Sequence, residues 1–104
     1  MPIQEIEEIV RQIIADVSPV RIYLFGSFAN GTYHDESDLD FYIVVADNGQ
    51  NLTDLTVRAY RAIRHIRKHA VDILIGTQAD FEARKSVPSI ENEVYNKGHL
   101  HYGK

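Results

Sequence analysis

The 104 residues of this chain are enough for one ordinary domain and too few for two. Hydrophobic residues make up 44% and charged residues 25%, which excludes a disordered chain, and the formal charge of −4 argues against a protein wrapped in nucleic acid. The absence of cysteine excludes a disulfide scaffold, a thiolate zinc site and a cysteine nucleophile. No membrane span or signal peptide is visible, so we expect a soluble, cytoplasmic, single domain over residues 1–104.

The chain opens on a predicted amphipathic helix that ends at Ser18-Pro19, because the residue before a proline is disfavoured in the helical region. Its apolar residues fit within about 140° of arc at 100° per residue; they are Ile3, Ile6, Ile9, Val10, Ile13, Ile14 and Val17. A strand is expected next, over Val20–Phe25, where β-branched and aromatic residues gather. A short helical turn over 28–31 and a polar loop over 32–37 follow.

The rest of the chain alternates strands with helices. A strand is predicted over Leu39–Val45, and a second amphipathic helix starts near Asn51 and extends its apolar face to Ala70. The remaining expected elements are a strand over Val71–Ile75 that ends at Gly76, helices around Ala79–Lys85 and Ile90–Asn96, and a last strand over His99–Tyr102. This alternation, without internal repeats, predicts the α/β class.

The stretch GSFANGTYHDESDLD, residues 26–40, places two aspartates at the start of the second strand. Alternate residues of a strand point the same way, so Asp38 and Asp40 share a face while Leu39 enters the core. Ionising two adjacent carboxylates in a partly buried site is unfavourable unless a cation joins them. An Asp-x-Asp pair on its own more often marks a turn or a solvated edge.

Asp72 lies inside the third strand, which is an unexpected place for a solubilising charge if that strand is central. If the third strand pairs with the second, Asp72 completes a three-carboxylate cluster with Asp38 and Asp40. Hard divalent cations such as Mg²⁺ prefer carboxylate and phosphate oxygens. Such a cluster is the ligand set of a two-metal phosphoryl- or nucleotidyl-transfer site.

Gly26-Ser27 directly follows the first strand and opens the helical turn. A glycine there lets phosphates approach the backbone, and the N–H groups of Ser27 and Phe28 and the Ser27 hydroxyl can donate to them. A Gly-Ser pair alone is an ordinary loop. In combination with the three aspartates, it favours a nucleotide site.

The pattern of Gly-Ser, ten intervening residues, Asp-x-Asp and a later strand aspartate resembles the nucleotidyltransferases of the DNA polymerase β superfamily. The short chain is similar to the minimal nucleotidyltransferases, often found as antitoxins beside HEPN-domain toxins. The resemblance runs from the first helix through VRIYLFGSFANG, SDLDFYIVV and VDILI to IENEVYNKGHLHYG. It implies an α/β fold with a small mixed β-sheet flanked by helices, the polymerase β-like nucleotidyltransferase core.

The resemblance also implies a role for each matched residue. Gly26 and Ser27 would hold the triphosphate of ATP, Asp38 and Asp40 would hold two Mg²⁺ ions, and Asp72 would bind metal and activate the acceptor hydroxyl. AMP would then pass from ATP to a tyrosine of a cognate HEPN-domain toxin, in a hetero-oligomer with that toxin. No membrane contact and no stable nucleic-acid binding are expected.

Two other functions stay open at this stage. An interaction module could inhibit its partner by binding alone, and the chain has Asn30 where many relatives carry arginine, which favours this alternative. Transfer to a small molecule such as an aminoglycoside is the other, although such enzymes generally carry an additional substrate domain. The intact Gly-Ser pair and three aspartates favour the enzyme.

A basic stripe is expected on the second long helix, opposite its apolar face. We interpret it as a solvated face, with a docking surface for an acidic partner as the alternative; it comprises Arg58, Arg61, Arg64, His65 and Lys68. His65 and His69 have the i, i+4 spacing of metal ligands. No third ligand is apparent, so we interpret both as surface histidines.

Overall fold

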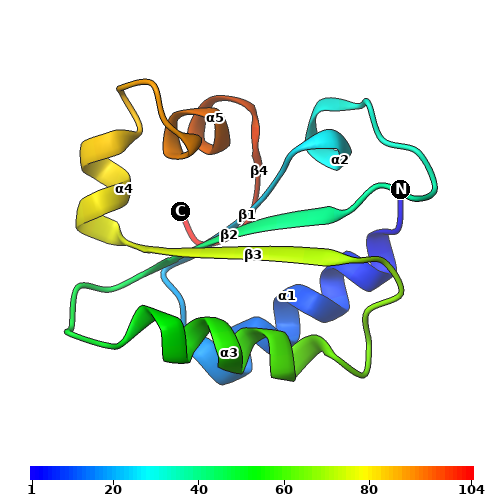
Figure 1. Ribbon diagram of the computed structural model, residues 1–104, viewed down its shortest axis with the longest axis horizontal. Helices are drawn as coiled ribbons and strands as arrows, with labels where there is room; N and C mark the ends of the chain where they lie inside the picture. The colour runs from blue at the N-terminus through cyan, green and yellow to red at the C-terminus, as the bar shows by residue number, and fades with distance from the viewer.

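The structure is a computed structural model that describes residues 1–104. Its elements are α1 (Ile3–Val17), β1 (Arg21–Phe25), α2 (Ser27–Asn30), β2 (Leu39–Val45), α3 (Leu52–Ile63), β3 (Val71–Thr77), α4 (Gln78–Arg84), α5 (Ile90–Lys97) and β4 (His99–Tyr102). The four strands form one sheet in the order β3-β2-β1-β4 (Figure 1). The predicted α/β class and the small mixed sheet are confirmed.

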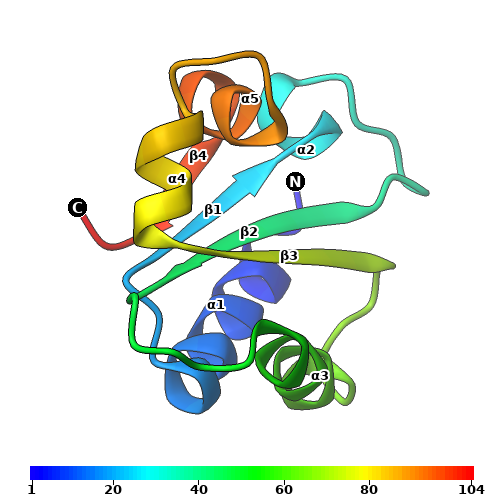
Figure 2. The same cartoon turned by 60° about the vertical axis from the view of Figure 1, so that its left-hand side comes forward.

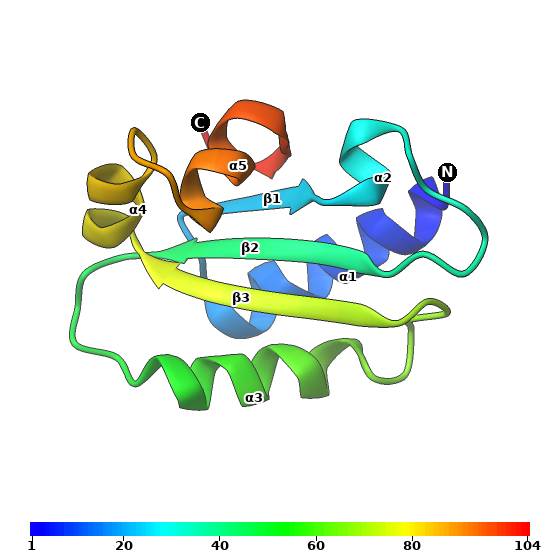
Figure 3. The same ribbon diagram turned by 45° about the horizontal axis from the view of Figure 1, so that its top comes forward.

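Strand directions bring the ends of three strands together. β1 runs antiparallel to β2 and to β4, whereas β2 and β3 are parallel. The register places Asp40 opposite Phe25 on one side and opposite Asp72 on the other. The end of β1 and the starts of β2 and β3 therefore meet at one end of the sheet, next to α2 (Figure 3).

Helices cover both faces of the sheet, α1 and α3 on one and α4 and α5 on the other (Figure 2). Residues of β2 alternate between two cores, which is why the strand has a nearly continuous apolar sequence. Leu39, Phe41 and Ile43 enter a cluster of 17 buried residues with α1 and α3. Tyr42 and Val44 join a smaller cluster of 6 residues that includes Phe81 and Val94 from α4 and α5.

The helix predicted to extend to Ala70 ends at Ile63. The backbone then tightens into turns in which Arg64 N–H donates to Arg61 and Ile66 N–H donates to Ile63. The Glu5 carboxylate of α1 accepts hydrogen bonds from the backbone N–H groups that follow, at Lys68 and His69. A partner distant in sequence thus holds the segment after the helix, and the helical pattern beyond Ile63 was misleading.

The third strand continues through Gly76 to Thr77, beyond the predicted end. A side chain at Gly76 would meet the Tyr42 hydroxyl at 2.2 Å, so glycine permits this packing. β3 is also an edge strand, not a central one, and its residues Asp72 and Leu74 are exposed. None of the helices combines the length and apolar character that crossing a bilayer requires.

Candidate active site

The carboxylates of Asp40 and Asp72 come together because their strands are neighbours in parallel register. Asp40 is half-buried, and Leu39 beside it is fully buried, as the alternation predicted. Burial raises the pKa of Asp40 to about 6, and the neighbouring carboxylates of Asp72 and Asp38 add to the effect. Carboxylates thus surround Asp40, and their mutual repulsion favours either a proton or a cation at this point.

Gly26 gives Asp40 the space that it occupies. A Cβ atom at Gly26 would lie 2.2 Å from Oδ2 of Asp40, and the residue has a positive φ of 75°. Both observations require glycine, since L side chains rarely adopt this backbone conformation. The contact places the turn after β1 directly against the carboxylate pair.

Ser27 begins the short helix α2, whose first turn closes on Gly26. The Gly26 carbonyl accepts hydrogen bonds from the N–H groups of Ala29 and Asn30, at 3.1 Å each. The first N–H groups of a helix have no acceptor within the helix and can donate to a bound group. Ser27 follows Gly26, which lies against Asp40, so the N–H groups at the start of α2 are close to that carboxylate and can donate to an anion.

Asn30 closes the turn after α2. Its Oδ1 atom accepts hydrogen bonds from the N–H and the hydroxyl of Thr32, at 3.2 and 2.6 Å. The side chain is thus committed to local structure and carries no charge. The triphosphate site implied by the sequence has no cation at this position.

Asp38 is exposed just before β2 and acts on Asp40 through its charge. No three His, Cys, Asp or Glu side chains of the protein converge in a geometry that would hold a metal ion. The register pairs Asp40 with Asp72, whereas Asp38 precedes β2 and has no register partner; Asp38 and Asp72 are both exposed. The donor set itself is all carboxylate, which is the chemistry that Mg²⁺ prefers.

Glu93 is a fourth carboxylate of this region that the sequence analysis missed. Its charge contributes to the raised pKa of Asp40, although it comes from α5, more than fifty positions along the chain. No motif or spacing links Glu93 to residues 26–40. Only the packing of α5 over the sheet brings it near.

His69 is not the surface histidine expected from the sequence. Its Nδ1 lies 2.6 Å from Oε1 of Glu5, whose side chain is 4% exposed. The His69 ring also packs edge-on against Phe28 of α2, with centroids 5.6 Å apart. The histidine thus joins α1, the segment before β3 and the helix that follows Gly26.

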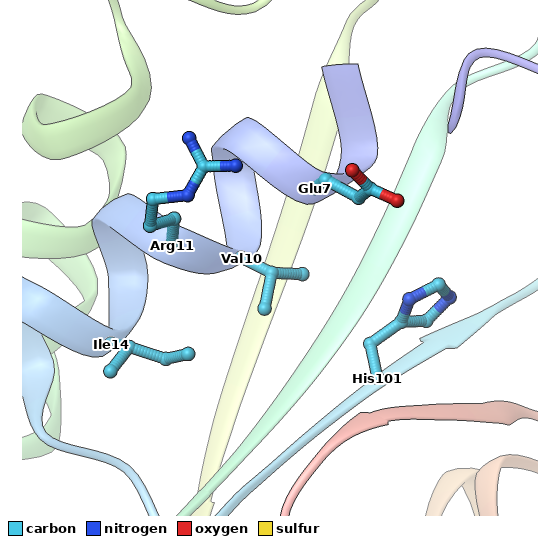
Figure 4. A pocket seen from close by; sticks show the side chains of 5 residues that line it. All are labelled: Glu7, Val10, Arg11, Ile14 and His101. Carbon is cyan, nitrogen blue, oxygen red and sulfur yellow. The ribbon is translucent and has the colours of Figure 1, made fainter. Parts of the chain in front are cut away.

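The carboxylate site lies on an open surface. The depressions of the protein are lined by other residues, and none includes the Gly-Ser pair or the three aspartates. One of about 300 Å³ lies between α1 and β4, with Glu7, Val10 and His101 around it (Figure 4). A second substrate at the carboxylate site would therefore be enclosed only by surface of the molecule that carries it.

Comparison with known proteins gives a consistent result. The model of the family described as "Nucleotidyltransferase domain" matches residues 3–101. A curated relative from Methanocaldococcus jannaschii, named "Putative protein adenylyltransferase MJ0141", is 41% identical over 49 residues. That match covers 41% of this chain and 50% of the relative, so this chain spans about half the length of the relative.

Solved structures with the same fold have lower identity. A spectinomycin adenyltransferase, AAD(9), from Enterococcus faecialis, with ATP and spectinomycin, aligns with a TM-score of 0.67 at 18% identity, over 98% of this chain and 55% of that one. A toxin-antitoxin structure with AMP-PNP aligns with a TM-score of 0.60 at 24% identity, over 100% of this chain and 75% of that one. These similarities establish the fold.

Proposed function

Because this chain belongs to the nucleotidyltransferase domain family, we propose that it transfers AMP from ATP to a tyrosine hydroxyl of a HEPN-domain toxin and so acts as its antitoxin. The observation that carries the proposal is the pairing of Asp40 with Asp72 directly against the Gly26 turn. This arrangement sets carboxylates beside a backbone suited to phosphates. The adenylyltransferase name of the curated relative and the toxin-antitoxin structure support the choice of donor and partner.

Different residues bind the triphosphate, hold the metal and accept the proton. Ser27 and the first turn of α2 hold the triphosphate, and Asp38, Asp40 and Asp72 would hold Mg²⁺. When bound, magnesium would neutralise charge on the triphosphate and on the leaving pyrophosphate. Asp72 is exposed on an edge strand, where it can accept the proton of the acceptor hydroxyl as the oxygen bonds to the α-phosphorus.

The open site favours an acceptor carried by another protein. Most of the chain forms the sheet and its covering helices, and the three aspartates line none of the depressions of the protein. A small acceptor needs an enclosing pocket, whereas a folded partner supplies its own wall and positions its hydroxyl. The spectinomycin enzyme, of which this chain spans 55%, has additional chain of its own.

Intact-mass measurement tests the proposal. The protein is incubated with Mg²⁺, ATP and the protein encoded beside it, and we expect the partner to gain about 329 Da per AMP, mapped to tyrosine. Asp72→Asn is the matched variant, because an amide retains the side-chain shape but cannot accept the acceptor's proton. If the partner's mass stays unchanged while its activity is still blocked, inhibition is by binding alone and transfer to this partner is disproved.

A further inference from the structure

A group of exposed arginines lies on α3 and the turn after it. They surround a depression of about 290 Å³, and we call its lining the arginine patch; it consists of Val57, Tyr60, Arg61, Arg64 and Arg67. Val57 is 44% exposed and Tyr60 is 39% exposed. The patch therefore combines apolar surface with three guanidinium groups.

The arginines of the patch have no acidic partner in the protein. None of the ion pairs includes Arg61, Arg64 or Arg67, and Arg67 donates only to the carbonyl of His69, at 3.2 Å. No aspartate or glutamate occurs between Asp54 and Asp72. The patch is therefore positively charged, although the whole chain has a net charge of −4.

The structure separates these arginines from the rest of the basic stripe expected on the helix. Arg58 donates to the carbonyl of Asp16 at the end of α1, which is a structural contact. Lys68 lines a different depression, together with glutamates of α1 such as Glu8. The patch is thus smaller and more localised than the stripe in the sequence indicated.

The arginine patch adjoins the strand that carries the proposed proton acceptor. The Tyr60 hydroxyl accepts a hydrogen bond from the N–H of Ile73, at 2.9 Å, on the free edge of β3. Ile73 is the residue after Asp72. The end of α3 and the start of β3 lie at the same end of the molecule (Figures 1 and 3).

We propose that the arginine patch is the docking surface for an acidic segment of the protein that presents the acceptor hydroxyl, an inference that rests on the proposed function. Guanidinium groups pair with carboxylates through two parallel hydrogen bonds, and Tyr60 and Val57 add apolar contact. Ile73 packs in the core with α3, so the Asp72 side chain lies on the other face of the sheet. A segment held at the patch therefore passes around the free edge of β3 to bring its neighbouring hydroxyl to Asp72. Proteins that bind nucleic acids typically have an excess of basic residues. This protein has 11 Lys+Arg against 15 Asp+Glu, which argues against a nucleic acid as the ligand of the patch.

Binding of a defined probe tests the surface without ATP. The probe is a fluorescent peptide, Glu-Glu-Glu-Tyr-Glu-Glu-Glu, compared with the same peptide carrying Gln for Glu and with oligouridylate RNA. We expect the acidic peptide to bind most tightly, with an affinity that falls as salt rises. The double variant Arg61→Glu/Arg64→Glu should lower the affinity at least about tenfold, which corresponds to about 1.4 kcal/mol.

The control is Arg11→Glu, which makes one of the same Arg-to-Glu substitutions, half the change of charge of the double variant, at an exposed position on α1. It should bind the peptide as the unchanged protein does, and circular dichroism verifies that all variants are folded. The inference is overturned if the double variant retains the affinity, if Arg11→Glu loses it equally, or if RNA binds more tightly than the acidic peptide.

A parallel measurement separates this inference from the proposed function. Asp72→Asn should bind the acidic peptide normally while failing to transfer AMP, because the two tasks use different residues. With the natural partner, the double variant should raise KM for the partner more than it lowers kcat. Peptide binding that depends on the patch, in a protein that never modifies tyrosine, would support the docking surface and disprove the proposed transfer.

Discussion

At Gly26 the backbone has a positive φ of 75° and passes in contact with the Asp40 carboxylate. We expect Gly26→Ala to lower the free energy of unfolding by about 2–4 kcal/mol, because the new Cβ both strains the backbone and displaces Oδ2 of Asp40. Gly49→Ala is the control, since Gly49 has a φ of 77° and nothing within 4 Å of its Cβ position. Urea denaturation compares the two. Equal losses would show that backbone strain alone, and not the contact with Asp40, makes Gly26 necessary.

Asp40 carries a charge that destabilises the protein in the absence of a bound cation. Its pKa is raised to about 6, so its ionisation is less favourable in the folded than in the unfolded state. The unfavourable contribution therefore appears as pH rises from about 4 and is complete above about 6. We expect Asp40→Asn to raise apo stability by about 1–2 kcal/mol at pH 8, with little gain near pH 4.

Thermal melts at both pH values measure this effect. Asp35→Asn, at an exposed position in the preceding loop, is the matched control and should change stability by less than about 0.5 kcal/mol. AMP transfer by Asp40→Asn should be lost although the protein is more stable. If Asp40→Asn were less stable than the unchanged protein at pH 8, the repulsion between carboxylates would not be the cause of the destabilisation.

At the scale of elements, Glu5 joins α1 to the segment between α3 and β3. Burial opposes ionisation of Glu5, but hydrogen bonds from the backbone of His69 and Lys68 and from the His69 side chain outweigh it, so the pKa of Glu5 is lowered. For a carboxyl group of lowered pKa, the stabilisation is present above its ordinary value of 4.5 and disappears as pH falls through the folded-state value.

We expect Glu5→Gln to lower the free energy of unfolding by about 1–3 kcal/mol at pH 7, because the amide lacks the charge that strengthens these hydrogen bonds. The difference should shrink as pH falls below about 4. Glu8→Gln is the control, since Glu8 forms an exposed pair with Arg11, and it should cost less than about 0.5 kcal/mol. A loss that did not depend on pH would mean that packing, and not the carboxylate charge, holds this segment.

At the scale of the whole molecule, the two faces of the sheet are stabilised unequally. The face under α1 and α3 has a core of 17 buried residues, whereas the face under α4 and α5 has a core of 6. Regions with fewer buried apolar contacts open at lower free energy than the global unfolding reaction. Amide hydrogen exchange should therefore be at least about tenfold faster in α4 and α5 than in α1 and β2, and uniform protection of all four elements would contradict this.

The sequence alone was sufficient for the types of element and for the residues of the Gly-Ser and Asp-x-Asp motifs. Helical and strand periodicity are local, so the bounds of β2 and β4 were predicted as observed. The alternation of Leu39 and Asp40 also followed from one strand by itself. The third aspartate could be named, but its position beside Asp40 depended on which strands became neighbours.

Only the tertiary structure decided the contacts between segments. The parallel register that faces Asp40 with Asp72, the approach of Glu93 and the bond from Glu5 to His69 each join residues at least 30 positions apart. Such contacts are set by how the helices pack on the sheet, and no spacing along the chain encodes them. For the same reason the basic stripe became a smaller arginine patch, because Arg58 bonds to the end of α1 and Lys68 lies in a depression with glutamates of α1.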